Sequence, residues 1–385
     1  MNDHYNSKQD GTITTKVVCA ISFLLFSFLW LFELQADALA VAQHVLSQGH
    51  THYEKVLGSL IIVSVLYLVQ FVVAHIGRIP RRTYALTYFP SLLILAFLSD
   101  FVVDDNHEVS VSTWCWLFPL LLVLWGVCVW LARQFLPFSN NHRQYRGVLS
   151  TRTWLNLLQM LVMMLLVALL SNTNAVYLNT AHAEAALQQC DFDEAARVGE
   201  ESLETSERLT MLRAFALSKK GTLADQLFTY PVKGTSQTIL PMTVKPFMLS
   251  EDSIWKHLGA KPHSMMPTEH LYEILERDSL ATPAVADYRL CGYLMDRNLD
   301  AFVKTLPCYY TVADTLPLPR HYREALILYK HQSKAPQIAY SDSLLEEQWA
   351  TLQQLQSDYK VPSERHYQIF CSFQHSYWYY YLYSR

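Results

Sequence analysis

The residues of this chain best suited to chemistry at a membrane surface are acids that follow two apolar runs. Glu33 and Asp37 lie four residues apart after the first run, a spacing that puts two side chains on one helical face. Asp104 and Asp105 form a second acidic pair after a later run. Such carboxylates could hold a metal ion or act as a general base. Charge asymmetry between loops would also place acids there, so a catalytic role and a purely topological one both stay open.

Histidines give a second candidate site. His50 and His52, with His44 and Glu54 nearby, are side chains of the types that bind metals. The segment lacks the fixed helical spacing or paired CxxC motifs of specific metal sites, so we expect a solvated loop. Signatures of serine hydrolases, P-loops and dinucleotide-binding folds are absent, and only 11 glycines occur in 385 residues. We therefore expect no cofactor.

Four cysteines lie in the last part of the chain: Cys190, Cys291, Cys308 and Cys371. They allow three disulfide connectivities, and Cys291 with Cys308 is the best pair because the two fall on consecutive expected helices. Buried free thiols on helices are the interpretation we favour.

The C-terminal segment 364–383 is rich in aromatic residues and is expected to form one helix. Its first aromatics recur at steps of three and four, which places them on one face: Tyr367, Phe370, Phe373 and Tyr377. The simpler interpretation is a terminal helix packed on the preceding hairpin. The other is an exposed platform for glycan or a membrane interface. The candidate contact residues of that platform are Tyr377, Trp378, Tyr380 and Tyr381.

Apolar runs divide the chain into two parts. About 20 mostly apolar residues are needed for a helix to cross a bilayer, and five runs in the first 171 residues approach or reach that length. After a tail of residues 1–16, the expected spans are about 17–34, 56–77, 84–103, 114–132 and 153–171. Residues 1–171 carry a formal net charge of +1, and residues 172–385 carry −5. An acidic soluble part gives no support to nucleic-acid binding.

Basic residues predict the orientation. Nine Lys and Arg occupy the N-terminal tail and the second and fourth loops. The first and third loops contain a single basic residue, Lys55. The positive-inside rule then puts the N-terminus in the cytoplasm and residues 172–385 outside. The motif Ala38-Leu39-Ala40 after the first span resembles a signal-peptide cleavage site. Because Glu33 and Asp37 precede it, we expect an uncleaved span, and cleavage would leave the later orientation unchanged.

Residues 172–385 read as helix hairpins with a Pro-rich interruption at 231–270. One helix is expected over residues 175–189. A second should begin at a capping box formed by Asp191 and Glu194 and end at about residue 203. Another should begin at a second capping box, Ser343 and Glu346, and end at residue 359. The chain is thus expected to be all-α, with a multi-spanning transmembrane helix bundle followed by a helical-hairpin domain.

Two stretches carry a family resemblance. The segment QQCDFDEAARVGEESL resembles the middle of a tetratricopeptide repeat, with Cys190 to Ala195 at the turn and Ala183 at the small-residue position. Residues 295–301 repeat this pattern, and residues 221–224 do so more weakly. The Trp and Gly positions of strong repeats are missing, so a generic array of helical hairpins remains an equal alternative. Both imply stacked helix pairs that offer a groove.

Five spans followed by a degenerate repeat domain are similar to uncharacterised envelope proteins of bacteria. The resemblance implies a multi-pass inner-membrane protein with a periplasmic helical domain, in contact with lipid and with another envelope protein or a glycan. We expect binding rather than catalysis. The alternative is an envelope enzyme acting on lipid-linked saccharide, since membrane glycosyltransferases with such substrates place an essential acid in their first external loop.

Overall fold

The computed structural model describes residues 2–77, 79–111, 113–135, 150–262, 264–312, 318–338 and 340–384. In these ranges the protein is all-α apart from one short hairpin of two-residue strands. The chain divides into two compact units, Met1–Leu178 and Asn179–Arg385. Each unit has its own hydrophobic core.

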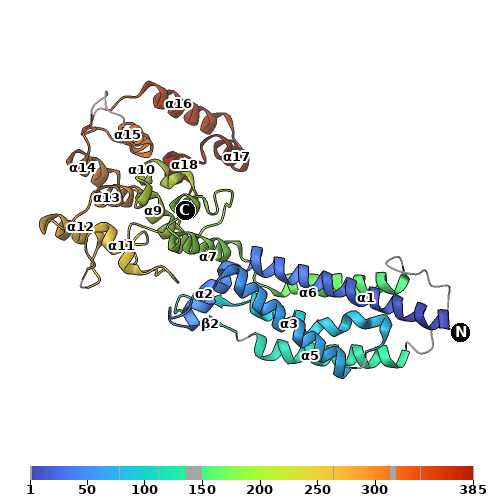
Figure 1. The fold of residues 1–385 in the computed structure, drawn as a ribbon. Coiled ribbons are helices and arrows are strands. Elements are labelled where there is room, and N and C mark those ends of the chain that lie inside the picture. Colours follow the sequence, from blue (N-terminus) through green and yellow to red (C-terminus); the bar gives the residue numbers. More distant parts are fainter. Residues whose placement is uncertain are drawn as a thin grey trace. The chain divides into compact units, whose positions relative to one another are not determined.

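The first unit is a bundle of long helices joined by short irregular segments (Figure 1). In chain order its elements are α1 (Asn2–Leu29), the π-helical turn η1 (Trp30–Leu34), α2 (Ala36–Leu46), α3 (Lys55–Gly77), the 3-10 helix η2 (Arg81–Tyr88), α4 (Phe89–Ser99), β1 (Val102–Val103), β2 (Val109–Ser110), α5 (Trp114–Phe135), α6 (Thr151–Leu170) and the start of α7 (Ala175–Gln188). The two strands pair antiparallel, with Val103 opposite Val109.

Four helical segments of the described chain are long and apolar enough to cross a membrane. They are Ile13–Leu34, Lys55–Gly77, Trp114–Gln134 and Thr151–Leu170. Their outward faces expose large apolar side chains such as Leu68, Val123 and Leu165, each more than half exposed. Such faces suit a lipid environment and not water. The protein is therefore a multi-pass membrane protein.

The third expected span, residues 84–103, does not form one long helix. The backbone leaves helical geometry at Thr83, continues as the 3-10 helix η2, and becomes α-helical only from Phe89 to Ser99. Pro90 stands at the start of α4, where the missing N–H costs nothing. The expectation of five regular spans is thus wrong at this segment, because local hydropathy does not reveal a change in helix type.

Other helices supply the polar groups that the irregular segment needs. The amide of Ala85 donates to Asn156 Oδ1 of α6 at 2.8 Å, and Trp125 Nε1 of α5 donates to the carbonyl of Leu86 at 2.9 Å. The regular helix α4 that follows is joined to α3, since Ser91 Oγ donates to the carbonyl of Leu66 at 2.7 Å. Irregular backbone at membrane depth is tolerated where protein surrounds it in this way.

The same hydrogen bonds fix the directions of the elements. The amide of Asn172, just after α6, donates to the carbonyl of Ser99, so η2 and α4 run alongside α6 in the same direction. Thr15, near the start of the apolar segment Ile13–Leu34, and Thr153, near the start of α6, share a 3.0 Å hydrogen bond. Since α3 and α5 pack antiparallel to η2 and α4, four basic residues gather at one end of the bundle: Lys16, Arg82, Arg133 and Arg152. Lys55, at the start of α3, lies at the other end.

The second unit consists of shorter helices joined by ordered loops. It contains the rest of α7, α8 (Phe192–Arg197), α9 (Glu207–Lys220), α10 (Leu223–Gln226), the 3-10 turn η5 (Leu227–Thr229), α11 (Glu251–Leu258), α12 (Thr268–Arg277), α13 (Ala284–Met295), α14 (Leu299–Tyr309), α15 (Arg320–Gln332), α16 (Ser343–Asp358), α17 (Pro362–Phe373) and α18 (Tyr377–Tyr383). The helix expected to reach residue 203 ends at Arg197, because Val198 turns extended and Gly199 has φ 72°.

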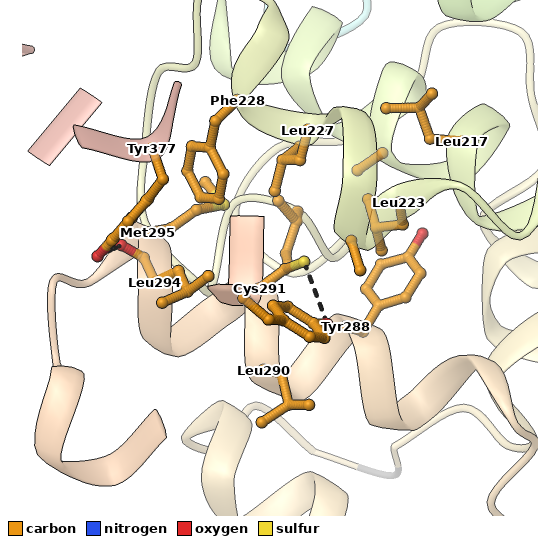
Figure 2. Packing of buried hydrophobic residues seen from close by; sticks show 14 of the residues in the cluster. Leu217, Leu223, Leu227, Phe228, Tyr288, Leu290, Cys291, Leu294, Met295 and Tyr377 are labelled. Carbon is orange, nitrogen blue, oxygen red and sulfur yellow. Dashed lines mark hydrogen bonds between the residues drawn. The ribbon is translucent and has the colours of Figure 1, made fainter. Parts of the chain in front are cut away.

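The core of the second unit is built around α13 (Figure 2). Leu290, Cys291 and Leu294 of α13 are fully buried, and residues of α9, α10, η5 and α18 also join this core. Phe228 of η5 contacts the ring of Tyr377 of α18 with a centroid distance of 5.0 Å. Segments up to about 200 residues apart in sequence therefore share one core.

A buried polar cluster ties three elements of this unit together. His321 is fully buried, and its Nδ1 lies 2.9 Å from Glu324 Oε2. His321 Nε2 accepts the amide of Phe228 at 3.3 Å, which assigns the proton to Nδ1. The carboxylate of Glu324 also accepts the amide of Tyr377 at 2.7 Å. Burial raises the pKa of Glu324, but His321, Arg320 and this amide outweigh it, and the net pKa is lowered.

Candidate functional site

The acids at the first span do not share a continuous helical face. Glu33 is exposed in the π-helical turn η1, whereas Asp37 begins the separate helix α2 after a break at Gln35. Asp37 Oδ1 forms an ion pair with Lys55 Nζ at 2.9 Å. The π turn therefore separates two side chains that regular helical spacing would align.

The second acidic pair lies in the turn between β1 and β2. Asp104 Oδ1 accepts the amides of Asn106 at 3.0 Å and Glu108 at 2.9 Å. These bonds, led by the Glu108 amide, lower the pKa of Asp104. Asp105 is exposed in the same turn. Asp104 thus has a local structural role, as aspartate does in many turns.

The histidine candidates lie in the loop between α2 and α3. His50 and His52 are both exposed. Within the ranges that the structure describes, no group of three or more His, Cys, Asp or Glu side chains has the arrangement of a metal site.

Most of the aromatic platform candidates are core residues. Tyr377, Trp378 and Tyr380 are 0%, 1% and 8% exposed. Trp378 Nε1 donates to the carbonyl of Glu324 at 2.7 Å, and the hydroxyls of Tyr377 and Tyr380 donate to the carbonyls of Leu294 and Met295. Tyr381 is half-buried. In this structure the first three anchor α18 in the core and form no exposed platform.

The expected single helix over 364–383 is broken in two. Ser376 has extended backbone angles, and its Oγ accepts the amide of Tyr379 at 3.2 Å as the cap of α18. Tyr367 and Phe370 remain on α17, whereas Tyr377 lies on α18. A local serine cap outweighs the helical periodicity of the aromatics.

The cysteines are unpaired. Cys291 is buried with its Sγ 3.7 Å from the hydroxyl of Tyr322, and Cys308 is exposed on α14. Cys190 and Cys371 are also exposed, so the expectation of buried thiols is wrong for three of the four. Cys190 stands in a turn with φ 59° and not on a helix.

A cleft of 650 Å³ on the second unit brings together exposed rings that the core does not use. We call it the aromatic cleft and define it by six of its lining residues: Leu203, His366, Tyr367, Phe370, His375 and Tyr379. Tyr367 is 63% exposed and Leu203 is 72% exposed. Pockets of this size and apolar character, with a few polar groups, are typical ligand sites.

Arg213 holds one wall of the aromatic cleft. It is 2% exposed, and its guanidinium donates to the carbonyl of Val198 at 2.7 Å and of Pro231 at 3.3 Å. Its guanidinium also lies 4.5 Å from the centre of the Tyr230 ring. Burial lowers the pKa of Arg213 to about 10, which leaves it charged at neutral pH. One side chain thus fixes both loops that face α17.

The other wall is made by α17, α18 and the turn between them. His375 Nδ1 lies 2.7 Å from the carbonyl of Thr229, which connects this turn to the opposite loop. Tyr379 OH lies 3.2 Å from His366 Nε2, and its ring is 5.8 Å from that of Phe370. The buried residues of α18 anchor this helix in the core, and Tyr379 on the same helix lines the cleft.

The aromatic cleft is almost uncharged. Glu200 is the one carboxylate among the described residues that line it, and no lysine or arginine is among them. Ser202, Ser363 and Gln374 add neutral polar groups. The lining therefore suits a ligand with apolar faces and many hydroxyl or amide groups. It does not suit an anion.

Sequence reasoning identified Tyr367 and Phe370 as one helical face but not the rest of this site. The facing loops contribute Leu203 and Pro231, which lie more than 130 residues earlier in the chain. An isolated leucine in a loop gives no local signal of function.

Comparison with known proteins identifies a family without assigning an activity. The family described as "Family of unknown function (DUF6057)" matches residues 95–267 and 263–384. No curated protein and no solved structure matches the chain. The two matched ranges cover most of the sequence, including the last two long apolar helices and nearly all of the second unit. The chain belongs to the DUF6057 family of unknown function.

Proposed function

We propose that this protein is a membrane-anchored binding protein of the cell envelope, and that its second unit binds a neutral saccharide in the aromatic cleft. The observation that carries the proposal is the pairing of an exposed ring, Tyr367, with neutral polar side chains in a cleft of 650 Å³. The role is binding and not catalysis.

The chemistry of the lining favours a sugar. Sugar rings present an apolar C–H face that stacks on aromatic rings, and Tyr367 and Phe370 offer such rings. Gln374 and Ser363 can exchange hydrogen bonds with hydroxyl or acetamido groups. With Glu200 as the charged group of the lining, a phosphorylated ligand would find no cation to pair with.

We place the second unit on the outer face of a bacterial inner membrane. The support is the gathering of Lys16, Arg82, Arg133 and Arg152 at one end of the bundle, which the positive-inside rule assigns to the cytoplasm. In this arrangement the tetratricopeptide-like hairpins form a periplasmic scaffold for the aromatic cleft.

The test is a binding titration with the full-length protein in detergent. Soluble chito-oligosaccharides and gluco-oligosaccharides are the probes, and calorimetry measures Kd. We expect saturable binding of at least one series, and Tyr367→Ala should weaken it about tenfold or more through loss of an aromatic anchor.

Leu344→Ala is the matched control, since Leu344 is 62% exposed on α16, outside the lining of the cleft. It should leave Kd unchanged. Equal weakening by both substitutions, or binding of an apolar peptide but of neither sugar series, would refute the saccharide proposal.

A further inference from the structure

A second cavity of the second unit is separate from the aromatic cleft. Its volume is 770 Å³, and it lies between α9, α11 and the start of α13. Leu187, Phe192, Phe215 and Leu249 give it apolar walls. A cavity of this size can hold a ligand of drug-like dimensions.

Cationic and polar side chains line the same cavity. Lys219 and Lys256 both lie on it and are exposed. No carboxylate pairs with either lysine in the part of the chain that the structure describes. Although residues 172–385 carry a net charge of −5, two lysines against one carboxylate give the lining of this cavity a net positive charge.

Ser218 and His257 also line this cavity. Ser218 Oγ lies 2.8 Å from His257 Nε2, and His257 is held edge-on by Phe215 at a centroid distance of 5.6 Å. Burial, with a further effect of Lys219, lowers the pKa of His257 to about 4. The imidazole is therefore neutral at pH 7, and the pair acts as a polar contact without adding charge.

Two further features of the lining affect its charge: the start of α13 and the carboxylate of Asp287. Thr282, Pro283 and Ala284 bring the start of the twelve-residue helix α13 to the cavity, where the helix dipole favours negative charge. Asp287 is the one lining carboxylate, and its Oδ1 accepts hydrogen bonds from Tyr310 at 2.7 Å and Tyr322 at 2.9 Å. The Asp287 carboxylate thus has its hydrogen-bond donors in these two tyrosine hydroxyls and not in the lysines of the cavity.

We propose that this cavity binds a phosphate ester with an apolar substituent. Lys219, Lys256 and the Ser218 hydroxyl would hold the phosphate, and Leu187, Phe192 and Phe215 would cover the substituent. Lysines bind phosphate as point charges, whereas a carboxylate ligand would favour the planar fork of arginine, and no arginine lines the cavity among the described residues.

The test uses the full-length protein in a detergent without phosphate groups, with 1-naphthyl phosphate as the probe and calorimetry as the readout. We expect saturable binding, at least about tenfold weaker binding of 1-naphthol, and a similar loss in the double variant Lys219→Gln, Lys256→Gln. Inorganic phosphate should compete only weakly, because it lacks the apolar group. These results together would support the site.

The double variant Lys334→Gln, Lys360→Gln is the control, since both lysines are exposed outside the cavity. It should bind as the wild type does. Lysophosphatidic acid below its critical micelle concentration distinguishes the source: displacement of the probe indicates a lipid ligand, and no displacement indicates a soluble ester. Absence of saturable binding, or equal binding by the Lys219 and Lys256 variant, would overturn the proposal, whatever the outcome of the saccharide titration.

Discussion

Glu184 fixes the backbone of the Pro-rich interruption, although it is fully buried on α7. Its carboxylate accepts the amides of Phe247, Met248 and Leu249. Burial raises the pKa of Glu184, while the three amides and Arg208 oppose that effect. Hydrogen bonds to a buried carboxylate thus replace the helical bonds that prolines deny to this segment.

A single histidine is expected to make the second unit sensitive to mild acid. The folded-state pKa of His257 is about 4, below the unfolded value of about 6.5. Between these values the unfolded chain binds a proton that the folded chain does not. The contribution of His257 to stability is therefore complete above pH 6.5 and declines as the pH falls toward 4, by about 2 kcal/mol at pH 5.

Thermal unfolding of the full-length protein at pH 7 and pH 5, followed by tryptophan fluorescence, measures this effect. His257→Gln keeps a hydrogen-bonding group near Ser218 but cannot titrate, so its loss of stability on acidification should be smaller. His270→Gln is the control, because the His270 side chain is 60% exposed. An unchanged pH dependence in His257→Gln would contradict the assignment.

At the scale of elements, the irregular segment η2 depends on one side chain of α6. Asn156 is fully buried and bonds the amide of Ala85 and the carbonyls of Arg82 and Arg152. Asn156→Leu would make α6 more apolar yet leave these groups without partners. We expect a loss of about 1–2 kcal/mol of unfolding free energy, measured by titration with SDS in mixed micelles.

Gln159 gives a matched control one helical turn away. Its Oε1 is buried and has no hydrogen-bond partner within the described ranges. Gln159→Leu removes an unsatisfied polar atom and should be neutral or stabilising. If Asn156→Leu and Gln159→Leu have the same effect, the bonds of Asn156 to η2 carry no net stability.

The elements also show what local sequence signals can predict. Asp191 caps α8 as expected, since its side chain accepts the amide of Glu194 at 3.0 Å. The second capping box is shifted by one residue: Asp342 caps α16, and Glu346 instead pairs with Lys330. Asp342 also forms an ion pair with Arg323 of α15 at 3.2 Å, a contact that the local motif does not reveal.

The remaining differences have long-range causes. The 3-10 form of η2 depends on Asn156 and Trp125, which lie at least 39 residues away in sequence. The aromatic cleft depends on Arg213, which holds Val198 and Pro231 in place. Hydropathy and helical period predicted the all-α class and four of the apolar helices. They contain no information about contacts between distant segments.

At the scale of the whole molecule, the predicted orientation can be tested with a native thiol. Cys308 is exposed on α14. In a variant whose other cysteines are replaced by serine, a membrane-impermeant maleimide should label Cys308 in intact spheroplasts. The physical reason is the excess of basic residues at the opposite side of the spans.

The complementary variant lacks all native cysteines and carries Lys16→Cys at the basic end of the bundle. It should react only after lysis. The reverse pattern, with position 16 labelled in spheroplasts and Cys308 labelled only after lysis, would place the second unit in the cytoplasm and refute the envelope proposal.

The composite segment of η2 and α4 has a consequence for biosynthesis. The amide of Ala85 finds its acceptor on Asn156, 71 residues later in the chain. When residues 81–99 leave the ribosome, that acceptor has not been made, and free lipid offers no substitute. We therefore expect the translocon to retain this segment until α6 has been synthesised. The segment and α6 would then enter the bilayer together and not one helix at a time.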